Sequence, residues 1–162
     1  MEWRLCSSNA LGLYSCAEEL RLHRHFFFLL YFYIYNFKKG AEYISRYEKK
    51  YNSKLDIINI GSAAAVATHA TWSEYCATKA GVVMATKCWA EDGLYFVVIS
   101  PGRTRTRRRK ALFPDEDQNT LLEPADFAKV IMKAVKKEYP TGTHIIVRKN
   151  NVQDILNGNI IL

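Results

Sequence analysis

The chain has 162 residues, of which 49% are hydrophobic, and carries a formal net charge of +7. This composition argues against disorder, and the length allows one domain with a real core rather than two. The charge favours anionic partners such as nucleic acid, phosphorylated metabolites or an acidic membrane surface, without choosing among them. None of the four cysteines lies in a CxxC pair, so we expect reduced thiols and a cytoplasmic location.

Residues 1–25 show no clear periodicity, and residues 1–33 stay unassigned as a degenerate N-terminal segment. The apolar run FFFLLYFYIY over 26–35 is too short for a bilayer, which needs roughly 20 residues. We therefore expect no membrane span, and a buried or dimer-forming helix segment in its place. His23 and His25 lack an apparent third ligand, so the sequence predicts no metal site.

Helices and strands alternate from residue 34 onward. Apolar residues at helical spacing predict a helix over 34–51, and the β-branched run LDIINI over 55–60 predicts a buried strand. Thr71 and Glu74 fit a capping box, which would start a helix over 72–91.

A second continuous apolar strand, LYFVVIS, covers residues 94–100 and ends at a Pro-Gly pair. The basic run RTRTRRRK over 103–110 is predicted to be a loop. Pro124 suits the first turn of a further helix, and HIIVR over 144–148 predicts a third strand.

Strands that are apolar throughout and alternate with helices are typical of a parallel sheet covered on both faces. The predicted fold class is therefore α/β, with a doubly wound parallel sheet. We divide the chain into an unassigned N-terminal segment (1–33), an α/β region (34–150) and a C-terminal tail (151–162).

Tyr75 and Lys79 are the first candidates for chemistry, because residues four apart share one face of a helix. A phenol is a poor acid or base at neutral pH, but a nearby ammonium favours the phenolate. Such a tyrosine can exchange a proton with an alcohol or carbonyl. Ser62, after the first strand, could hold the substrate oxygen. By itself, a Tyr-xxx-Lys pair is more often an ordinary part of a helix.

The surroundings of this pair resemble the short-chain dehydrogenase/reductase family. The family has a strand ending in serine, a Tyr-xxx-Lys thirteen residues later, and a strand followed by Pro-Gly and threonine. Here IINIGS ends in Ser62, and YCATK carries Tyr75 at that spacing. PGRTRT places Thr106 where the family has its cofactor-contacting threonine. The resemblance covers residues 34–148.

The resemblance implies a Rossmann-like fold and an oxidoreductase that reduces a carbonyl or oxidises an alcohol with NAD or NADP. By the resemblance, Tyr75 is the catalytic acid/base, and Lys79 lowers the pKa of Tyr75 and binds the nicotinamide ribose. Ser62 orients and polarises the substrate carbonyl. Asn36 would be the catalytic asparagine that relays protons. The remaining residues implied at the nicotinamide end of the cofactor are Pro101, Gly102 and Thr106.

The sequence departs from the family at its N-terminal half. The family begins with a TGxxxGxG turn that cradles the pyrophosphate at a helix N-terminus, and no such spacing exists here. SSNALGLYS over 7–15 is either a degraded remnant of the family's Asn-Asn-Ala-Gly turn or unrelated. We therefore expect the catalytic half of a reductase with a truncated N-terminal half. The alternative is a catalytically incompetent fragment that acts as a dimerisation or interaction module.

Six of the eight residues in RTRTRRRK are basic, and three interpretations stay open: a solvated loop, a nucleic-acid or nuclear-import patch, and a substrate lid. No nucleic-acid-binding fold surrounds the run, so we expect no nucleic-acid partner. Our hypothesis is that Arg107 and Arg108 bind a phosphate or other anionic group of the substrate. By the resemblance, a homo-oligomer would form through the helices over 34–51 and 72–91.

Overall fold

The structure, a computed structural model, describes residues 39–40, 42–43, 46–50 and 55–159. Asn36, the aromatic run over 26–35 and the segment 7–15 lie outside the described residues. Every described residue between 39 and 50 is helical, as predicted for the helix over 34–51.

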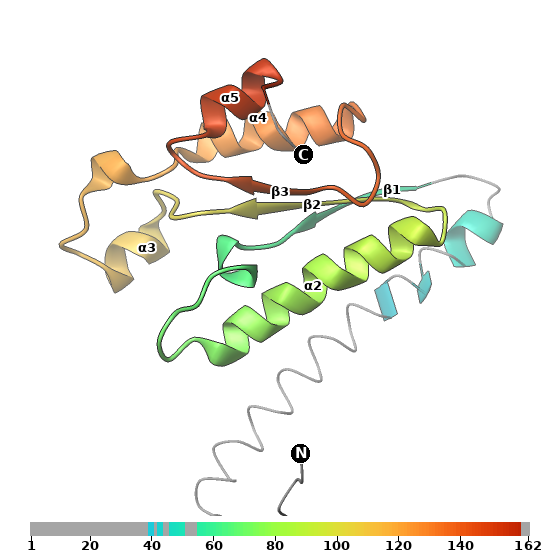
Figure 1. Ribbon diagram of the computed structural model, residues 1–162, viewed down its shortest axis with the longest axis horizontal. Coiled ribbons are helices and arrows are strands. Elements are labelled where there is room, and N and C mark those ends of the chain that lie inside the picture. The colour runs from blue at the N-terminus through green and yellow to red at the C-terminus, as the bar shows by residue number, and fades with distance from the viewer. Residues whose placement is uncertain (1–38, 41, 44–45, 51–54, 160–162) are drawn as a thin grey trace, which may run out of the picture.

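Three strands form one parallel sheet in the order β1–β2–β3 (Figure 1). They are β1 (Asp56–Ile60), β2 (Tyr95–Pro101) and β3 (His144–Val147). Each lies within one residue of its predicted bounds, because β-branched, apolar runs suit strands. The predicted burial of the first strand is wrong, since both ends of β1 are exposed and its middle residues are only partly buried. All three carboxyl ends meet at one edge of the sheet, where ligands bind in open α/β folds.

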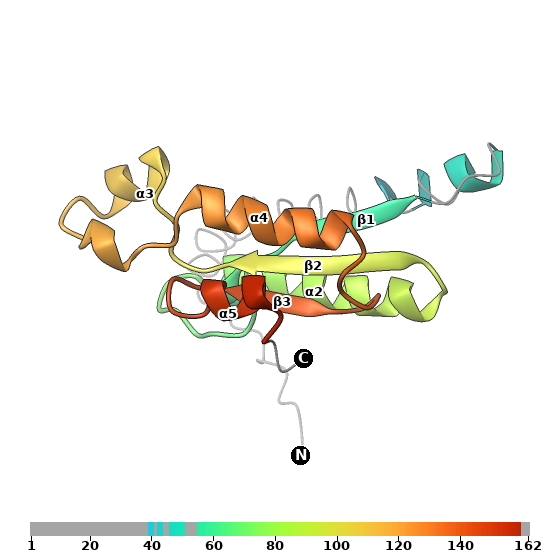
Figure 2. The ribbon, with the colours of Figure 1, turned by 90° about the horizontal axis from the view of Figure 1, so that it is seen from above.

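Helices cover both faces of the sheet, which confirms the predicted architecture (Figures 1 and 2). Helix α2 (Ser73–Glu91) lies on one face, whereas α4 (Pro124–Val135) and α5 (Val152–Asn157) lie on the other. The central strand β2 alternates its side chains accordingly. Val97 and Ile99 join the cluster beneath α4, while Val98 packs against α2.

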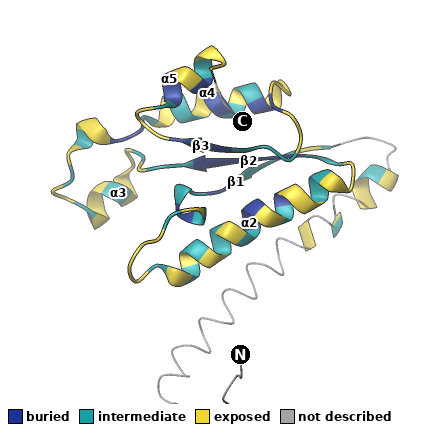
Figure 3. Cartoon of the chain, in the orientation of Figure 1, coloured by how far each residue is buried: buried dark blue, intermediate teal, exposed yellow. Residues whose placement is uncertain are grey.

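Most of the core lies between the sheet and α4 (Figure 3). Full burial of one valine or isoleucine side chain contributes about 1.5–3 kcal/mol, so this cluster is the main source of stability. Its fully or almost fully buried members are Val97, Ile99, Leu122, Val130, Ala134, Tyr139, Ile145, Val147, Val152 and Ile155.

Helix α5 falls in the segment predicted as a C-terminal tail, and the sequence analysis did not predict it. Val152 and Ile155 enter the core beside α4, and Gly158 ends the helix with a left-handed φ of 82°, a conformation that glycine adopts without strain. None of the helices in the described part of the chain is long and apolar enough to cross a membrane.

The capping box predicted at Thr71 and Glu74 is wrong. Trp72 is the N-cap of α2, and no side chain hydrogen-bonds to the free N–H groups there. Thr71 has a φ of 66°, in the left-handed region that β-branched residues rarely adopt. The chain turns at Thr71 before the helix begins, so its hydroxyl does not cap α2.

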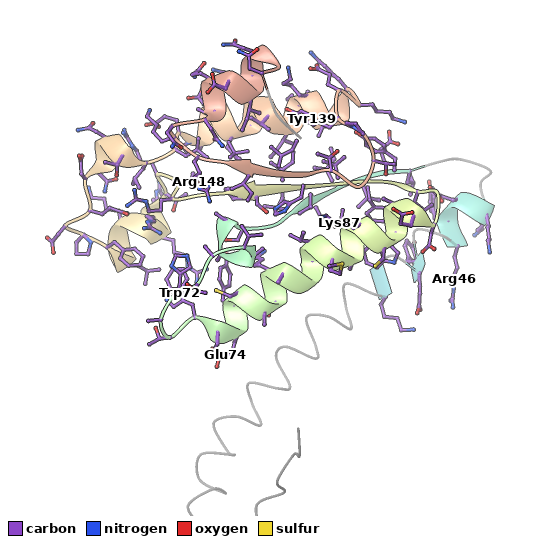
Figure 4. The ribbon with its side chains drawn as sticks, viewed as in Figure 1. Arg46, Trp72, Glu74, Lys87, Tyr139 and Arg148 are labelled. Atoms are coloured by element: carbon purple, nitrogen blue, oxygen red, sulfur yellow. The ribbon has the colours of Figure 1, made fainter. Side chains whose placement is uncertain are left out.

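Tyr139 carries a buried hydroxyl that has no hydrogen-bond partner among the described residues. Its ring lies between α4 and β3 (Figure 4) and belongs to the main core. Burial, with smaller contributions from Glu138 and Tyr95, raises the pKa of Tyr139 to about 12. The phenol is therefore neutral, and its unpaired hydroxyl costs stability.

We expect Tyr139→Phe to raise the free energy of unfolding by about 1 kcal/mol, because it removes an unsatisfied buried hydroxyl. Urea-induced unfolding measures the change. Tyr95→Phe is the matched control, since the Tyr95 hydroxyl donates to the carbonyls of Ala134 and Tyr139 at 3.2 and 3.0 Å. That variant should be less stable than the wild type. A destabilised Tyr139→Phe would mean that the hydroxyl has a partner.

Candidate active site

Ser62 stands at the carboxyl edge of the sheet, directly after β1. The N–H of Gly61 donates to the carbonyl of Ile99 at 2.9 Å, so the parallel ladder continues one residue beyond β1. Ser62 is extended and caps a short 3₁₀ turn, η1 (Ala63–Ala65), by accepting a hydrogen bond from the N–H of Ala64 at 3.2 Å. Its hydroxyl is thus anchored to the strand end and keeps its own proton to donate.

The first turns of α2 bring Tyr75 and Lys79 to the same edge. The Lys79 ammonium donates to the carbonyl of Ile60, the last residue of β1, at 3.2 Å. Its Nζ lies 5.9 Å from the centre of the Tyr75 ring. Tyr75 is 45% exposed, so a substrate can reach it from solvent.

Ser62, Tyr75 and Lys79 therefore meet at one rim of the sheet. The hydroxyls of Ser62 and Tyr75 make no hydrogen bond with each other, which is common before a substrate oxygen links two catalytic groups. Asn36, the fourth predicted catalytic residue, lies outside the described residues.

Pro101 and Gly102 lead out of the sheet beside β3. The N–H of Gly102 donates to the carbonyl of Val147 at 2.7 Å. A Cβ at Gly102 would lie 3.3 Å from that carbonyl oxygen and 3.2 Å from Cγ of Arg148, so a side chain here would be tightly packed and β3 would have to shift slightly.

Thr106 caps the helix α3 (Arg107–Leu112) with its side chain, which accepts a hydrogen bond from the N–H of Arg109 at 3.1 Å. The prediction of a loop over 103–110 is therefore wrong for its second half. Arginine and lysine are good helix formers, and the threonine cap supplies the start that the run needs.

These positions fit only one end of the expected dinucleotide. Pro101, Gly102 and Thr106 follow β2 at the rim that holds Lys79, where a nicotinamide ribose could be bound. Within the described ranges, no glycine-rich turn offers a cradle for the pyrophosphate, and no three potential metal ligands gather.

Two glutamates pair with three of the six basic residues of the run. The Arg109 guanidinium binds both carboxylate oxygens of Glu116, at 2.6 and 2.7 Å, and Arg103 reaches the same carboxylate at 3.2 Å. Arg105 pairs with Glu123 at 2.9 Å. Hydrogen bonds from Arg109 and the charges of both arginines hold the pKa of Glu116 below its usual range.

Arg107 and Arg108 are exposed and form no ion pair with any residue that the structure describes. Their neighbours, in contrast, fold the segment onto itself. The basic run is therefore split into arginines that shape the segment and arginines whose charges face solvent.

An aromatic cluster joins the start of α2 to the segment after α3. Trp72 contacts Tyr75 edge to face at 5.9 Å between ring centres, and it contacts His69 at 5.1 Å and Phe113 at 6.5 Å (Figure 4). Arg109 lies over the Phe113 ring at 4.3 Å. The sequence analysis missed Trp72, Phe113 and Glu116, because their contacts depend on the path of the loop.

A further polar pair lies beneath the site. The Ser100 hydroxyl, fully buried in β2, is 2.8 Å from Nε2 of His144 at the start of β3. Burial, with a smaller contribution from the charge of Lys87, lowers the pKa of His144, so the imidazole is neutral at pH 7. The sequence carried no signal for this pair, because it depends on the register between β2 and β3.

A family model described as short chain dehydrogenase matches residues 44–117, whereas no curated protein matches the chain. Among solved structures, a 4-hydroxyisoleucine dehydrogenase mutant complexed with NADH and succinate has 20% identity and a TM-score of 0.59. A short chain dehydrogenase from Leptospira borgpetersenii with bound NAD+ has 24% identity and a TM-score of 0.55. One from Shigella flexneri complexed with NADP has 27% identity and a TM-score of 0.50.

These three alignments cover 66%, 67% and 57% of this chain, and 51%, 48% and 42% of the respective neighbours. The chain thus spans about half the length of the structures that it matches. The shared fold is the Rossmann-like α/β sheet described above. The family match agrees with the similarity seen in the motifs, so over residues 44–117 the chain is similar to short-chain dehydrogenases.

Proposed function

We propose that the chain carries the catalytic part of an NAD(P)-dependent oxidoreductase that reduces a carbonyl or oxidises an alcohol. The observation that carries the proposal is the contact between the Lys79 ammonium and the Ile60 carbonyl. It brings Tyr75, one helical turn away, to the strand end that Ser62 follows. A proton donor and a hydroxyl thereby share the rim where ligands of this fold bind.

Each group has a separate task on the substrate oxygen. Ser62 donates a hydrogen bond that orients and polarises the carbonyl, Tyr75 delivers or removes the proton, and the Lys79 ammonium stabilises negative charge on the tyrosine oxygen. A bound nicotinamide supplies or accepts the hydride, and Lys79 and Thr106 would hold its ribose end. Neighbours complexed with NAD+, NADH and NADP support this cofactor class without fixing the preference.

The first test is NADH and NADPH titration followed by turnover of a small aldehyde, measured through cofactor absorbance. Tyr75→Phe should lower kcat by a factor of roughly 10² to 10⁴, the usual contribution of a positioned general acid. Tyr139→Phe, on the opposite face of the sheet, serves as the control and should keep wild-type kcat. Failure of the wild type to bind either cofactor would favour the alternative, a non-catalytic interaction module.

The substrate of this activity is proposed to carry an anionic group, such as a phosphate monoester. Arg107 and Arg108 support this. Glu116 and Glu123 pair with the neighbouring arginines, and neither Arg107 nor Arg108 forms an ion pair with a carboxylate among the described residues. The network around Glu116 also fixes the segment beforehand, which reduces the entropy lost when an anion binds. Guanidinium groups suit phosphate oxygens because they can donate two hydrogen bonds in one plane.

An aldehyde with a terminal phosphate should show a lower KM than the same aldehyde without it. We expect Arg107→Gln combined with Arg108→Gln to abolish most of that preference and to leave kcat for the neutral aldehyde unchanged. Lys129→Gln combined with Lys136→Gln removes the same charge from α4 and controls for net charge. If both double variants showed the same preference for the phosphorylated over the neutral aldehyde, a specific role for the two arginines would be contradicted.

A second copy of this chain is the proposed partner of α2. The helix buries Val82, Val83 and Thr86 against the sheet, yet its opposite side is also apolar, with Met84 61% exposed. Exposed apolar residues that gather on one side of a helix commonly mark an interaction surface. The exposed apolar residues of that side are Ala77, Ala80, Met84 and Cys88, and Lys87 and Glu91 lie beside them.

Met84→Glu should convert a dimer into a monomer, because it places a charge in the apolar contact. Light scattering after gel filtration measures the mass. Met132→Glu is the matched control, since Met132 is 52% exposed but lies on α4. A wild-type chain that is monomeric at high concentration would overturn the proposal.

A further inference from the structure

Gly61 sits directly over the Ser100 hydroxyl. A Cβ built on Gly61 would lie 2.2 Å from Oγ of Ser100, closer than real atoms approach, and 3.0 Å from Cγ2 of Val98, which is a tight contact. The φ of Gly61 is not positive, so an alanine would meet no backbone strain there. Glycine is required at this position because the Ser100 hydroxyl occupies the space that a side chain would need.

His144 holds that hydroxyl in place. Oγ of Ser100 lies 2.8 Å from Nε2 of His144, and the serine is completely buried. The bond crosses from β2 to β3, so it fixes one rotamer of Ser100 from a strand that does not touch β1. The position of Gly61, one residue beyond β1, therefore depends on the side chain of His144 two strands away.

The backbone before Ser62 is held from three directions. The Lys79 ammonium binds the Ile60 carbonyl, the Gly61 N–H binds the Ile99 carbonyl, and the Ser100 hydroxyl supports Gly61 from below. We propose that Ser100 and His144 are positioning residues. Their hydrogen bond fixes the position of the Gly61–Ser62 turn relative to β2, and the position of this turn places the Ser62 hydroxyl.

The consequence for Ser62 is geometric. Its hydroxyl accepts the Ala64 N–H at 3.2 Å, a long contact that a small shift of the turn would break or shorten. Misplacement of a catalytic group by about 1 Å can cost up to 10²-fold in rate. The inference rests on the proposed role of Ser62 where activity is concerned, but the position of the turn can be measured without activity.

The first experiment is a double-mutant cycle on the full chain, with unfolding in urea as the readout. Gly61→Ala alone should lower the denaturation midpoint strongly, because its methyl group collides with the Ser100 hydroxyl. In the Ser100→Ala background the same methyl enters the space that the hydroxyl has left, so the loss should be much smaller. Equal losses in both backgrounds would overturn the contact on which the proposal depends.

The second experiment follows the Ala64 amide in ¹H–¹⁵N spectra, because its proton reports the Ser62 hydroxyl directly. Ser100→Ala and His144→Phe should both move this resonance. Thr86→Val is the matched control: it removes another buried hydroxyl, which lies on α2 between that helix and the sheet and accepts from Asn59 at 2.9 Å. That variant should leave the Ala64 resonance in place.

The two proposals fail in different ways. An unmoved Ala64 resonance in Ser100→Ala and His144→Phe overturns the positioning role, whatever the enzyme does. A wild-type chain without turnover overturns the proposed function and leaves the resonance test valid. If the chain turns over, both variants should lower kcat at least tenfold with little change in KM, whereas a merely structural role would reduce stability alone.

Discussion

Parallel pairing of β1 with β2, in a register that sets Ile60 opposite Ile99, determines where Ser62, Tyr75 and Lys79 lie. Parallel strands end at a common edge, so the turns after β1 and β2 become neighbours although some forty residues separate them in the chain. The connection between them is α2, which must run back along the face of the sheet and therefore presents its first turns to that edge. Lys79 reaches Ile60 for this reason.

The sequence was sufficient for the elements that depend on local pattern. LDIINI, LYFVVIS and HIIVR are rich in β-branched and aromatic residues, and each forms a parallel strand, although β1 is only partly buried. It was insufficient where an interaction depends on the path of the backbone. The N-cap of α2 moved to Trp72 because Thr71 adopts a left-handed turn, which no spacing of residue types reveals.

The candidate site likewise contains residues that the local sequence pattern could predict and residues whose contacts depend on the path of the backbone. Ser62, Tyr75 and Lys79 were found because their spacing is encoded along the chain, and the structure brings them to one rim. Ser100 and His144 were not found, because a serine inside an apolar strand and a histidine at the start of another show their relation only once β2 and β3 are aligned. Glu116 was missed for a related reason, since which arginines it binds depends on how the segment after β2 folds back.

Under the proposed function, Lys79 has two tasks that depend on the same ammonium group. The same ammonium fastens α2 to the end of β1 and supplies the positive charge beside Tyr75. A lineage that lost the chemistry could still retain this lysine for its contribution to the fold. Its presence in a relative would therefore be weak evidence of the proposed activity, whereas Tyr75, whose ring is 45% exposed and outside the core clusters, would be the better marker of that chemistry.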